Sequence, residues 1–430
     1  MIEKEQKNKM QESTLYYKII KEVFKDHADA LIEKLNEPFH RSFIINTLKA
    51  SYTDLKDLLD FEAYPTGEEM VYDFDIDDIG KRKAYILGLL YPQERSAIMT
   101  HKLIKDHPAK LIVDLCAAPG GKTIDLAIKY KDEALIIANE VDKKRAQALL
   151  SNIERLGISN IIITTKDVDR LALELSGLAD IVVSDAPCSG MGMARKYPSI
   201  VNDLSEKDIK MNVIRQKKIS DAAYRLLKKD GLLLYSTCTY TYEENDGQII
   251  ELLKRHPFKI IDKKLFSFLD DTEGQYMCLL SKLDETDMTK PSFLKECKDK
   301  KIIQAIKKIV DISSLYLYEL DGSIYLSKVP LYDLDRAVLR YGIKAGEMKG
   351  DIFYPAHSLF RSNMMRERFF SVIDLDDIEY RKYIQGYELK KDVSNGFHLV
   401  THLGYALGYI KATNGTLKNK YPKGLRVTSL

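Results

Sequence analysis

Short apolar runs alternate with helical patterns through the middle of the chain. The runs LIVDL, ALIIANE, NIIITTKD, ADIVVSDAP and LLLYSTCTY are rich in Leu, Ile and Val, the pattern of strands buried on both faces. Helical patterns follow all of them except NIIITTKD, which leads into a short connection. Strands alternating with helices at this spacing predict a doubly wound, mostly parallel α/β sheet with right-handed crossovers.

The flanking segments have their own patterns. After ADIVVSDAP we expect one long helix over residues 203–231, and FKIID and GQYMCLLSK predict two closing strands at an antiparallel edge. Residues 1–60 predict a helical region in which RSFIINTLK forms a short strand, and YDFDIDDIGKRK is typical of a polar loop. Near the end of the chain, GFHLVTHLGYALGYIKATNG alternates strands with Gly turns and suggests a small barrel.

The stretch LIVDLCAAPGGKT predicts a strand, a tight turn and a helix. Ligands of parallel sheets bind beyond the carboxyl ends of the strands, so residues 114–122 line a small pocket suited to a nucleoside-type cofactor. A Walker phosphate loop has only weak support, because its first Gly position is Cys116. The chain also lacks G-x-G-x-x-G at this place, which removes most of the support for a dinucleotide cofactor.

Acidic residues end or closely follow four successive apolar runs. They are Asp114, Glu140, Asp167 and Asp185, and all four should emerge at the same edge of the sheet. The acid after the second strand typically binds the two ribose hydroxyls. With no second phosphate to hold, S-adenosylmethionine is the expected cofactor.

Two cysteines follow neighbouring strands and should meet at the mouth of this pocket. Cys188 lies in SDAPCSGMG and Cys238 in YSTCTY. Carbon 5 of cytosine accepts a methyl group only after a thiolate adds to carbon 6, so two thiols suit addition and later release. Lys122 is a candidate for lowering a thiol pKa and holding the base, and Asp185 for hydrogen bonding the ring.

Composition narrows the class of protein. A chain of 430 residues suggests a central domain with at least one further module, and a net charge of +2 leaves nucleic-acid binding to local patches. One such patch is the segment from residue 381 to 430, with nine basic and two acidic residues. Five scattered cysteines without C-x-x-C predict neither a metal site nor disulfides, and a charged N-terminus with no long apolar run predicts a soluble, cytoplasmic protein.

Several motifs occur in the order found in a known family. CAAPGGKT, DAPCSG with Arg195 and Pro198, and YSTCTY followed by EEN resemble the NOL/NOP/Sun family of RNA cytosine-5 methyltransferases; NTLK and YPQERS match its pattern ahead of the core. PAHSLFRS and LKNKYPKGLR resemble the bacterial RsmF-like group. The resemblance implies a Rossmann-like class I methyltransferase core over residues 85–285. It also implies a small N-terminal α/β extension (1–84), an α/β connecting region (286–345) and a PUA-like β-rich RNA-binding domain (346–430).

The resemblance also implies residue roles. Cys238 is the nucleophile and Cys188 assists product release, with Asp185 and Lys122 completing the catalytic set; the Thr-Cys setting of Cys238 favours RNA over DNA. One segment departs from the family, since TEGQYMCLL keeps Gly274 but lacks an aromatic pair. The implied cofactor residues are Cys116, Ala117, Ala118, Pro119, Gly120, Gly121, Lys122, Glu140, Arg145, Asp167 (by way of the adenine) and Asp185.

The expected function is S-adenosylmethionine-dependent methylation of carbon 5 of cytosine in 16S rRNA by a monomer that contacts no membrane. Two alternatives remain open: the same reaction on tRNA, or a non-catalytic RNA-binding ribosome assembly factor. Individual residues also have simpler interpretations. Lys122 can be a solvated lysine of the first helical turn, and Arg195 with Lys196 an exposed charge pair or a phosphate contact.

Overall fold

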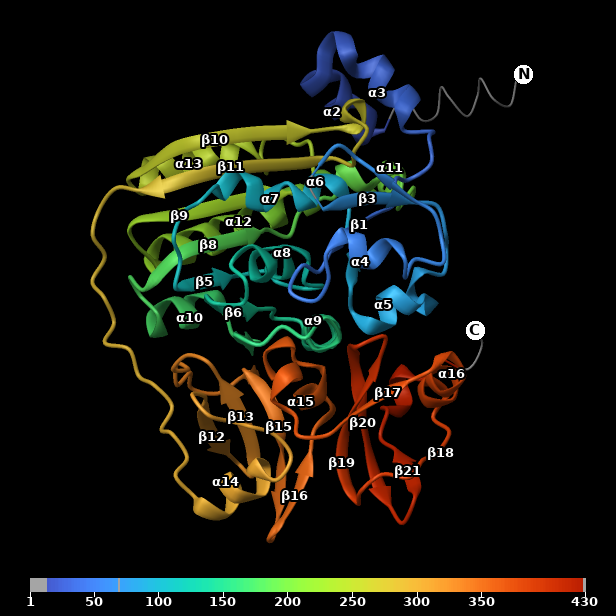
Figure 1. Ribbon diagram of the computed structural model, residues 1–430. Helices are drawn as coiled ribbons and strands as arrows, with labels where there is room; N and C mark the ends of the chain where they lie inside the picture. Colours follow the sequence, from blue (N-terminus) through green and yellow to red (C-terminus); the bar gives the residue numbers. More distant parts are fainter. Residues whose placement is uncertain (1–13, 69, 428–430) are drawn as a thin grey trace.

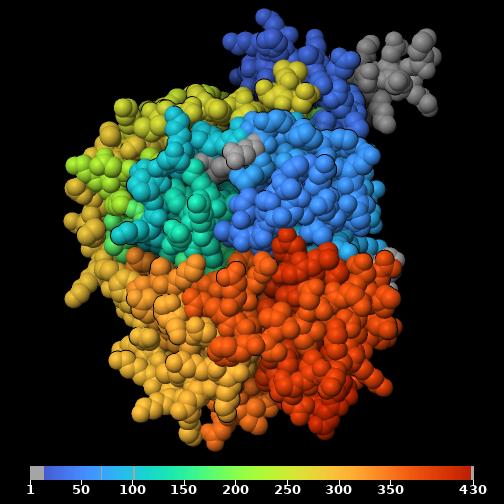
Figure 2. Space-filling view, viewed as in Figure 1, coloured from blue at the N-terminus to red at the C-terminus, as the bar shows by residue number. Residues whose placement is uncertain are grey.

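The computed structural model describes residues 14–68 and 70–427 of the chain. Figure 1 shows a large central sheet flanked by helices, a small N-terminal sheet beside it, and a C-terminal part built from two further sheets. In the space-filling view the C-terminal part, in orange and red, packs closely against both of the others (Figure 2).

Eight strands form the central sheet in the order β10-β11-β9-β8-β5-β6-β7-β14. The five strands from β9 to β7 run parallel, whereas β10, β11 and β14 pair antiparallel with their neighbours. The chain winds in opposite directions from β5 and β8, which confirms the predicted doubly wound core and creates a crevice at their carboxyl ends. The strands are β5 Leu111–Asp114, β6 Leu135–Asn139, β7 Ile161–Thr164, β8 Ala179–Asp185, β9 Leu227–Thr237, β10 Phe258–Phe266, β11 Gln275–Lys282 and β14 Val338–Tyr341.

Helices cover both faces of this sheet because successive strand side chains point to opposite sides. Leu111 and Val113 of β5 pack in one core with α10, α12 and α13, and Ile112 packs in a second core with α7, α8 and α9. The helices are α7 Thr100–Ile104, α8 Gly121–Lys129, α9 Lys143–Leu156, α10 Val168–Glu174, α12 Glu206–Leu226 and α13 Asp246–Arg255.

Two boundaries in the core differ from the prediction. Helix α12 ends at Leu226 and not at residue 231, because Leu227 pairs with Ala179 and begins strand β9. Helix α10 lies where a short connection was predicted, and Asp167 is its N-cap. An N-capping Asp satisfies an amide of the first helical turn and so stabilises even a short helix.

The N-terminal part contains a four-stranded sheet in the order β2-β3-β1-β4. Strand β1 confirms the strand predicted in RSFIINTLK, whereas β3 lies partly within the predicted polar loop, since Val71 and Phe74 are buried and Phe74 packs near Phe43. The predicted N-terminal helical region contains helices α2 and α3, and residues 1–13 lie outside the described part. The elements are α2 Leu15–Phe24, α3 Ala28–Lys34, β1 Ser42–Ile45, α4 Tyr52–Lys56, β2 Ala63–Pro65, β3 Val71–Phe74, α5 Lys83–Leu87, β4 Leu90–Pro92 and α6 Arg95–Ile98.

The C-terminal part contains two sheets, β12-β13-β15-β16 and β17-β19-β20-β21-β18. None of the described pairings joins β17 to β18, so the second sheet is open where a small barrel was predicted. The C-terminal part is nevertheless β-rich, as predicted. The elements are α14 Lys300–Lys307, β12 Tyr316–Leu320, β13 Ser323–Ser327, β15 Ile343–Lys349, β16 Ile352–Pro355, α15 His357–Arg361, β17 Val372–Leu375, α16 Asp377–Gln385, β18 Leu389–Lys390, β19 Gly396–His402, β20 Tyr405–Thr413 and β21 Thr416–Asn419.

Across residues 14–68 and 70–427, no helix is both long and apolar enough to cross a bilayer. The same ranges contain no group of three or more His, Cys, Asp or Glu side chains arranged to hold a metal ion.

Candidate active site

The loop between β5 and α8 is held in shape by Asp114. Its buried carboxylate accepts hydrogen bonds from the Thr123 hydroxyl at 2.6 Å and from the Cys116 amide at 3.2 Å. Burial raises the pKa of Asp114 to about 6. Gly120 has a φ of 122°, and a Cβ there would lie 3.0 Å from Ile124, so this tight turn requires glycine. The Asp114 carboxylate therefore bonds to the protein itself and stabilises this loop.

Glu140 follows β6 and offers a free acceptor at the same edge. One carboxylate oxygen, Oε1, accepts from the Asp142 amide at 3.0 Å, and Arg145 Nη1 lies 3.3 Å from Oε2. Oε2 is buried and accepts no hydrogen bond from the described residues. Arg145 also donates to the Ala118 carbonyl at 2.7 Å, which ties Glu140 to the loop after β5. A buried carboxylate oxygen that accepts no hydrogen bond suits a ligand hydroxyl.

Asp167 is engaged differently from Glu140. Its carboxylate caps α10 through the Asp169 amide at 3.0 Å and pairs with Lys218 Nζ at 2.6 Å. The hydrogen bond from Lys218 lowers the pKa of Asp167. The side chain is 58% exposed, so it borders the crevice from the solvent side. Its role at the adenine stays a prediction.

Lys122 and Asp185 form an ion pair inside the crevice. Lys122 Nζ lies 2.7 Å from Asp185 Oδ2, and Ser236 donates to Asp185 Oδ1 at 2.8 Å. The Lys122 side chain is only 6% exposed, so the interpretation as a solvated first-turn lysine is wrong. Asp185 is 41% exposed and therefore accessible to a ligand in the crevice.

The two predicted thiols meet. Cys188 Sγ and Cys238 Sγ are 3.3 Å apart, and the Cys238 amide donates to Cys188 Sγ at the same distance. Both cysteines are free and half-buried. The hydrogen bond with Cys238, followed by burial, raises the pKa of the Cys188 thiol. The Cys188 thiol is therefore harder to ionise than a free cysteine.

Glu244 joins the loop that carries Cys188 to the loop that carries Cys238, called the two thiol loops below. The sequence analysis assigned Glu244 no role. It is fully buried, and its carboxylate accepts from the Ser189 amide at 3.0 Å and from the Ser189 hydroxyl, next to Cys188. It also accepts from Thr241 at 2.8 Å and Gln216 at 3.0 Å. The only signal in the sequence was the EEN triplet after YSTCTY.

Glycines allow the loop after β8 that carries Cys188, called the catalytic loop below, to approach its neighbours closely. The Gly192 amide donates to the Cys238 carbonyl at 2.9 Å, and the Gly274 amide donates to the Gly192 carbonyl at 2.9 Å. A Cβ on Gly192 would lie 2.5 Å from the backbone of Gly274. TEGQYMCLL therefore supports the catalytic loop through Gly274, although it lacks the family's aromatic pair.

Arg195 is buried behind the same loop, so the alternatives of an exposed charge pair and a phosphate contact are both wrong for it. Its side chain and that of Glu273 are 0% exposed, and Nη2 lies 2.7 Å from Glu273 Oε1. Nη2 also donates to the Thr272 carbonyl at 2.6 Å. Lys196, the next residue, is exposed.

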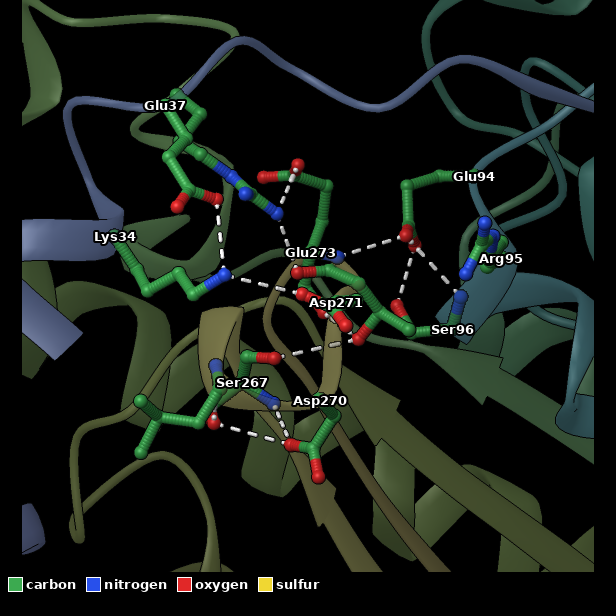
Figure 3. Close-up of polar contacts among 12 residues, drawn as sticks. Lys34, Glu37, Glu94, Arg95, Ser96, Ser267, Asp270, Asp271 and Glu273 are labelled. Atoms are coloured by element: carbon green, nitrogen blue, oxygen red, sulfur yellow. Dashed lines mark hydrogen bonds and ion pairs between the residues drawn. The ribbon is translucent and has the colours of Figure 1, made fainter. Parts of the chain in front are cut away.

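Figure 3 shows how the segment around Glu273 is anchored. The Glu273 amide donates to Glu94 at 2.9 Å, and Lys34 of α3 lies 3.2 Å from Asp271. Burial outweighs the Arg195 charge and raises the pKa of Glu273 to about 7. The N-terminal helices and YPQERS thus converge on the turn that supports the catalytic loop.

Comparisons with known proteins agree with this geometry. A family model described as 16S rRNA methyltransferase RsmB/F matches residues 101–290, and one described as methyltransferase RsmF PUA domain matches residues 370–427. A ribosomal RNA small subunit methyltransferase F of Shewanella loihica is 27% identical, over 92% of this chain and 91% of that protein.

Two further relatives match the core. A tRNA (cytosine(49)-C(5))-methyltransferase of Pyrococcus abyssi is 35% identical, over 56% of this chain and 79% of that protein. The crystal structure of NSun6 from Pyrococcus horikoshii with SFG has the same fold, with a TM-score of 0.58 and 21% identity over 63% of this chain and 98% of that one. The chain belongs to the NOL/NOP/Sun family, in its RsmF-like group, and is an RNA methyltransferase.

Proposed function

We propose that this enzyme methylates carbon 5 of a cytosine in 16S ribosomal RNA, with S-adenosylmethionine as the methyl donor. The observation that carries the proposal is the 3.3 Å contact between Cys188 Sγ and Cys238 Sγ, at the strand ends that also bear Asp185. Carbon 5 of cytosine is a poor nucleophile, so its methylation calls for covalent activation by a thiolate. Two thiols in contact suit a reaction that must both form and break a carbon–sulfur bond.

The residues around the loop after β5 fit the proposed cofactor. Glu140 Oε2 is a buried oxygen that forms an ion pair with Arg145 but accepts no hydrogen bond from the described residues, which leaves it able to accept from a ribose hydroxyl. The loop from Cys116 to Gly121 carries only small side chains, so an adenosine can lie close to its backbone. When bound, the cofactor supplies an electrophilic methyl group.

Each side chain in the crevice has its own role in the reaction on the cytosine base. Cys238 attacks carbon 6 and forms a carbon–sulfur bond, which makes carbon 5 nucleophilic. Asp185, held by Lys122, hydrogen bonds the ring and stabilises the charge that develops there. After methyl transfer, carbon 5 gives up its proton to solvent, the electron pair of that bond restores the double bond between carbons 5 and 6, and Cys238 leaves carbon 6 as a thiolate. Cys188, in contact with Cys238 Sγ, is the group that assists this release.

The substrate is a base flipped out of folded RNA. A relative named for the ribosomal small subunit aligns over 92% of this chain, including the PUA-like domain, and this favours 16S rRNA. The relative named for tRNA aligns over 56%, so tRNA is the second candidate. Cys188, Cys238 and Asp185 are all present at the crevice, which disfavours a non-catalytic assembly factor. Because the proposed substrate is rRNA, we propose that the enzyme works in the cytoplasm. We also propose that it is a monomer.

The proposal is tested with radiolabelled S-adenosylmethionine and RNA from a strain that lacks the gene. We expect label in 16S rRNA and 5-methylcytosine at one or more positions by bisulfite mapping. Label confined to tRNA would overturn the rRNA assignment, and no transfer to any RNA would support the assembly factor. Cys238→Ala is the matched inactive control.

A further inference from the structure

The two thiol loops are paired with each other on both sides of their cysteines. Two residues before the cysteines, the Ala186 amide donates to the Ser236 carbonyl at 2.9 Å. One residue after them, the hydroxyls of Ser189 and Thr239 lie 2.7 Å apart. Strands β8 and β9 are neighbours (Figure 1), and these contacts continue their parallel pairing beyond the strand ends. The backbone therefore holds the two thiols at matching positions on adjacent segments.

The two sulfur atoms need little movement to form a covalent bond. Cys188 Sγ and Cys238 Sγ are 3.3 Å apart, whereas a disulfide joins its sulfurs at about 2.05 Å. Cys188 Sγ also accepts from the Cys238 amide at 3.3 Å, so it already contacts the residue that it would join. The remaining gap of about 1.3 Å is within the reach of side-chain rotation.

A small oxidant can reach this pair from solvent. Residues 231–237 and 239–241 are buried, whereas Cys238 between them is half-buried. Cys188 is half-buried as well, and the contact between the two sulfurs is only partly covered. Cys278, by contrast, is fully buried in β11. The two thiols are therefore both close to each other and accessible, as a pair that is oxidised together must be.

We propose that Cys188 and Cys238 form a reversible disulfide when the enzyme meets a peroxide, and that this bond stops methylation. The Cys238 thiolate attacks one oxygen of hydrogen peroxide; a sulfur–oxygen bond forms, the oxygen–oxygen bond breaks and hydroxide leaves. The Cys188 sulfur then attacks the Cys238 sulfur; the disulfide forms, the sulfur–oxygen bond breaks and a second hydroxide leaves. One proton from each thiol converts both hydroxides to water. The two thiols lose two electrons, which reduce the peroxide.

The contact between the sulfurs decides which oxidation product forms. A sulfenic acid without a neighbouring thiol reacts with more peroxide and becomes a sulfinic acid, which a dithiol does not reduce. Cys188, already in contact, converts the sulfenic acid of Cys238 to a disulfide instead. The disulfide occupies the sulfur that would attack carbon 6, and a dithiol restores both thiols. The bond itself does not depend on the proposed function, whereas its effect on activity rests on it.

The test uses the full chain, treated with a small molar excess of hydrogen peroxide and afterwards with dithiothreitol. Free thiols are counted after denaturation, and peptides are mapped without reduction by mass spectrometry. Cys188→Ser removes the thiol that captures the sulfenic acid. Cys297→Ser is the matched control, because Cys297 is a half-buried free cysteine that packs in a different core. Methyl transfer to 16S rRNA is measured on the same samples.

We expect peptides linked through Cys188 and Cys238 in the wild type and in Cys297→Ser, with a loss of methyl transfer of about 100-fold that dithiothreitol reverses. Cys188→Ser should instead gain about 32 Da at Cys238, and dithiothreitol should not remove it.

Other results would contradict the proposal. A wild type without linked peptides, or with Cys238 linked to another cysteine, would overturn the bond. Linked enzyme with full methyl transfer would overturn its effect on activity. An untreated enzyme that methylates no RNA would overturn the proposed function and that effect together, whereas the peptide map would still decide the bond.

Discussion

Cys188 Sγ and Cys238 Sγ lie 3.3 Å apart although the residues are 50 positions apart in the sequence. The contact exists because β8 and β9 are adjacent parallel strands whose carboxyl ends open on the same crevice. The Cys238 amide also donates to Cys188 Sγ, and this fixes the relative position of the two loops.

This contact predicts opposite behaviour for the two alanine variants. Cys188→Ala should accumulate a covalent protein–RNA adduct, because addition by Cys238 proceeds and release fails. Cys238→Ala should form none. A mobility shift on a denaturing gel, sensitive to ribonuclease, measures the adduct. The control is Cys278→Ala, a buried cysteine in β11 outside the crevice. Adduct in Cys238→Ala alone would mean that the two roles are exchanged.

Glu244→Ala should impair the enzyme although Glu244 is assigned no contact with a substrate. The change leaves donors from Ser189, Thr241 and Gln216 unpaired, and we expect it to cost roughly 3 kcal/mol of stability and about 100-fold in kcat. Glu244→Gln should be milder, because the hydroxyls of Ser189 and Thr241 can turn to accept from its amide.

Melting temperature and single-turnover methylation measure these effects. Glu243→Ala is the control, since Glu243 is an exposed neighbour. If Glu244→Ala and Glu243→Ala gave the same kcat, Glu244 would have no positioning role.

Glu140→Gln should weaken cofactor binding. The change removes the negative charge that the buried Oε2 offers to a ligand hydroxyl, and a hydrogen bond to a charged group contributes about 1.5–3 kcal/mol. We expect the dissociation constant for S-adenosylmethionine to rise roughly 10- to 100-fold by calorimetry. RNA affinity should not change. The exposed Glu133, replaced by Gln, is the control; equal cofactor affinity in both variants would argue against a cofactor role for Glu140.

Glu273 should make stability depend on pH. Burial raises its pKa from 4.5 to about 7, so the folded state binds a proton more tightly than the unfolded state does. Its contribution to stability is therefore complete below about pH 4.5 and is lost as the pH rises to about 7. The shift corresponds to roughly 3 kcal/mol.

Glu273→Gln removes this dependence. The variant should gain melting temperature relative to the wild type between pH 5 and pH 8, while Glu133→Gln should not. Melting curves of the three proteins that stay parallel across this pH range would show that Glu273 is not the group responsible.

Much of the core was predictable from the sequence. The runs ending at Asp114, Glu140 and Asp185 became parallel strands, because a strand buried on both faces must be apolar along its whole length. The expected helix through residue 231 was wrong because Lys228 and Lys229 belong to β9, where a register shift lets polar residues reach solvent. Helical propensity alone does not reveal such a shift.

By itself, the sequence determined the alternation of strands and helices in the core except for α10, the glycine turn at Gly120 and the two thiols as candidates. These features depend on local periodicity and residue chemistry, which can be read directly from the sequence. Only the tertiary structure decided that Lys122 is buried against Asp185, that Arg195 pairs with Glu273 and that Glu244 joins both thiol loops. These contacts link residues from 28 to 78 positions apart, and such pairings arise only when the sheet brings distant segments together.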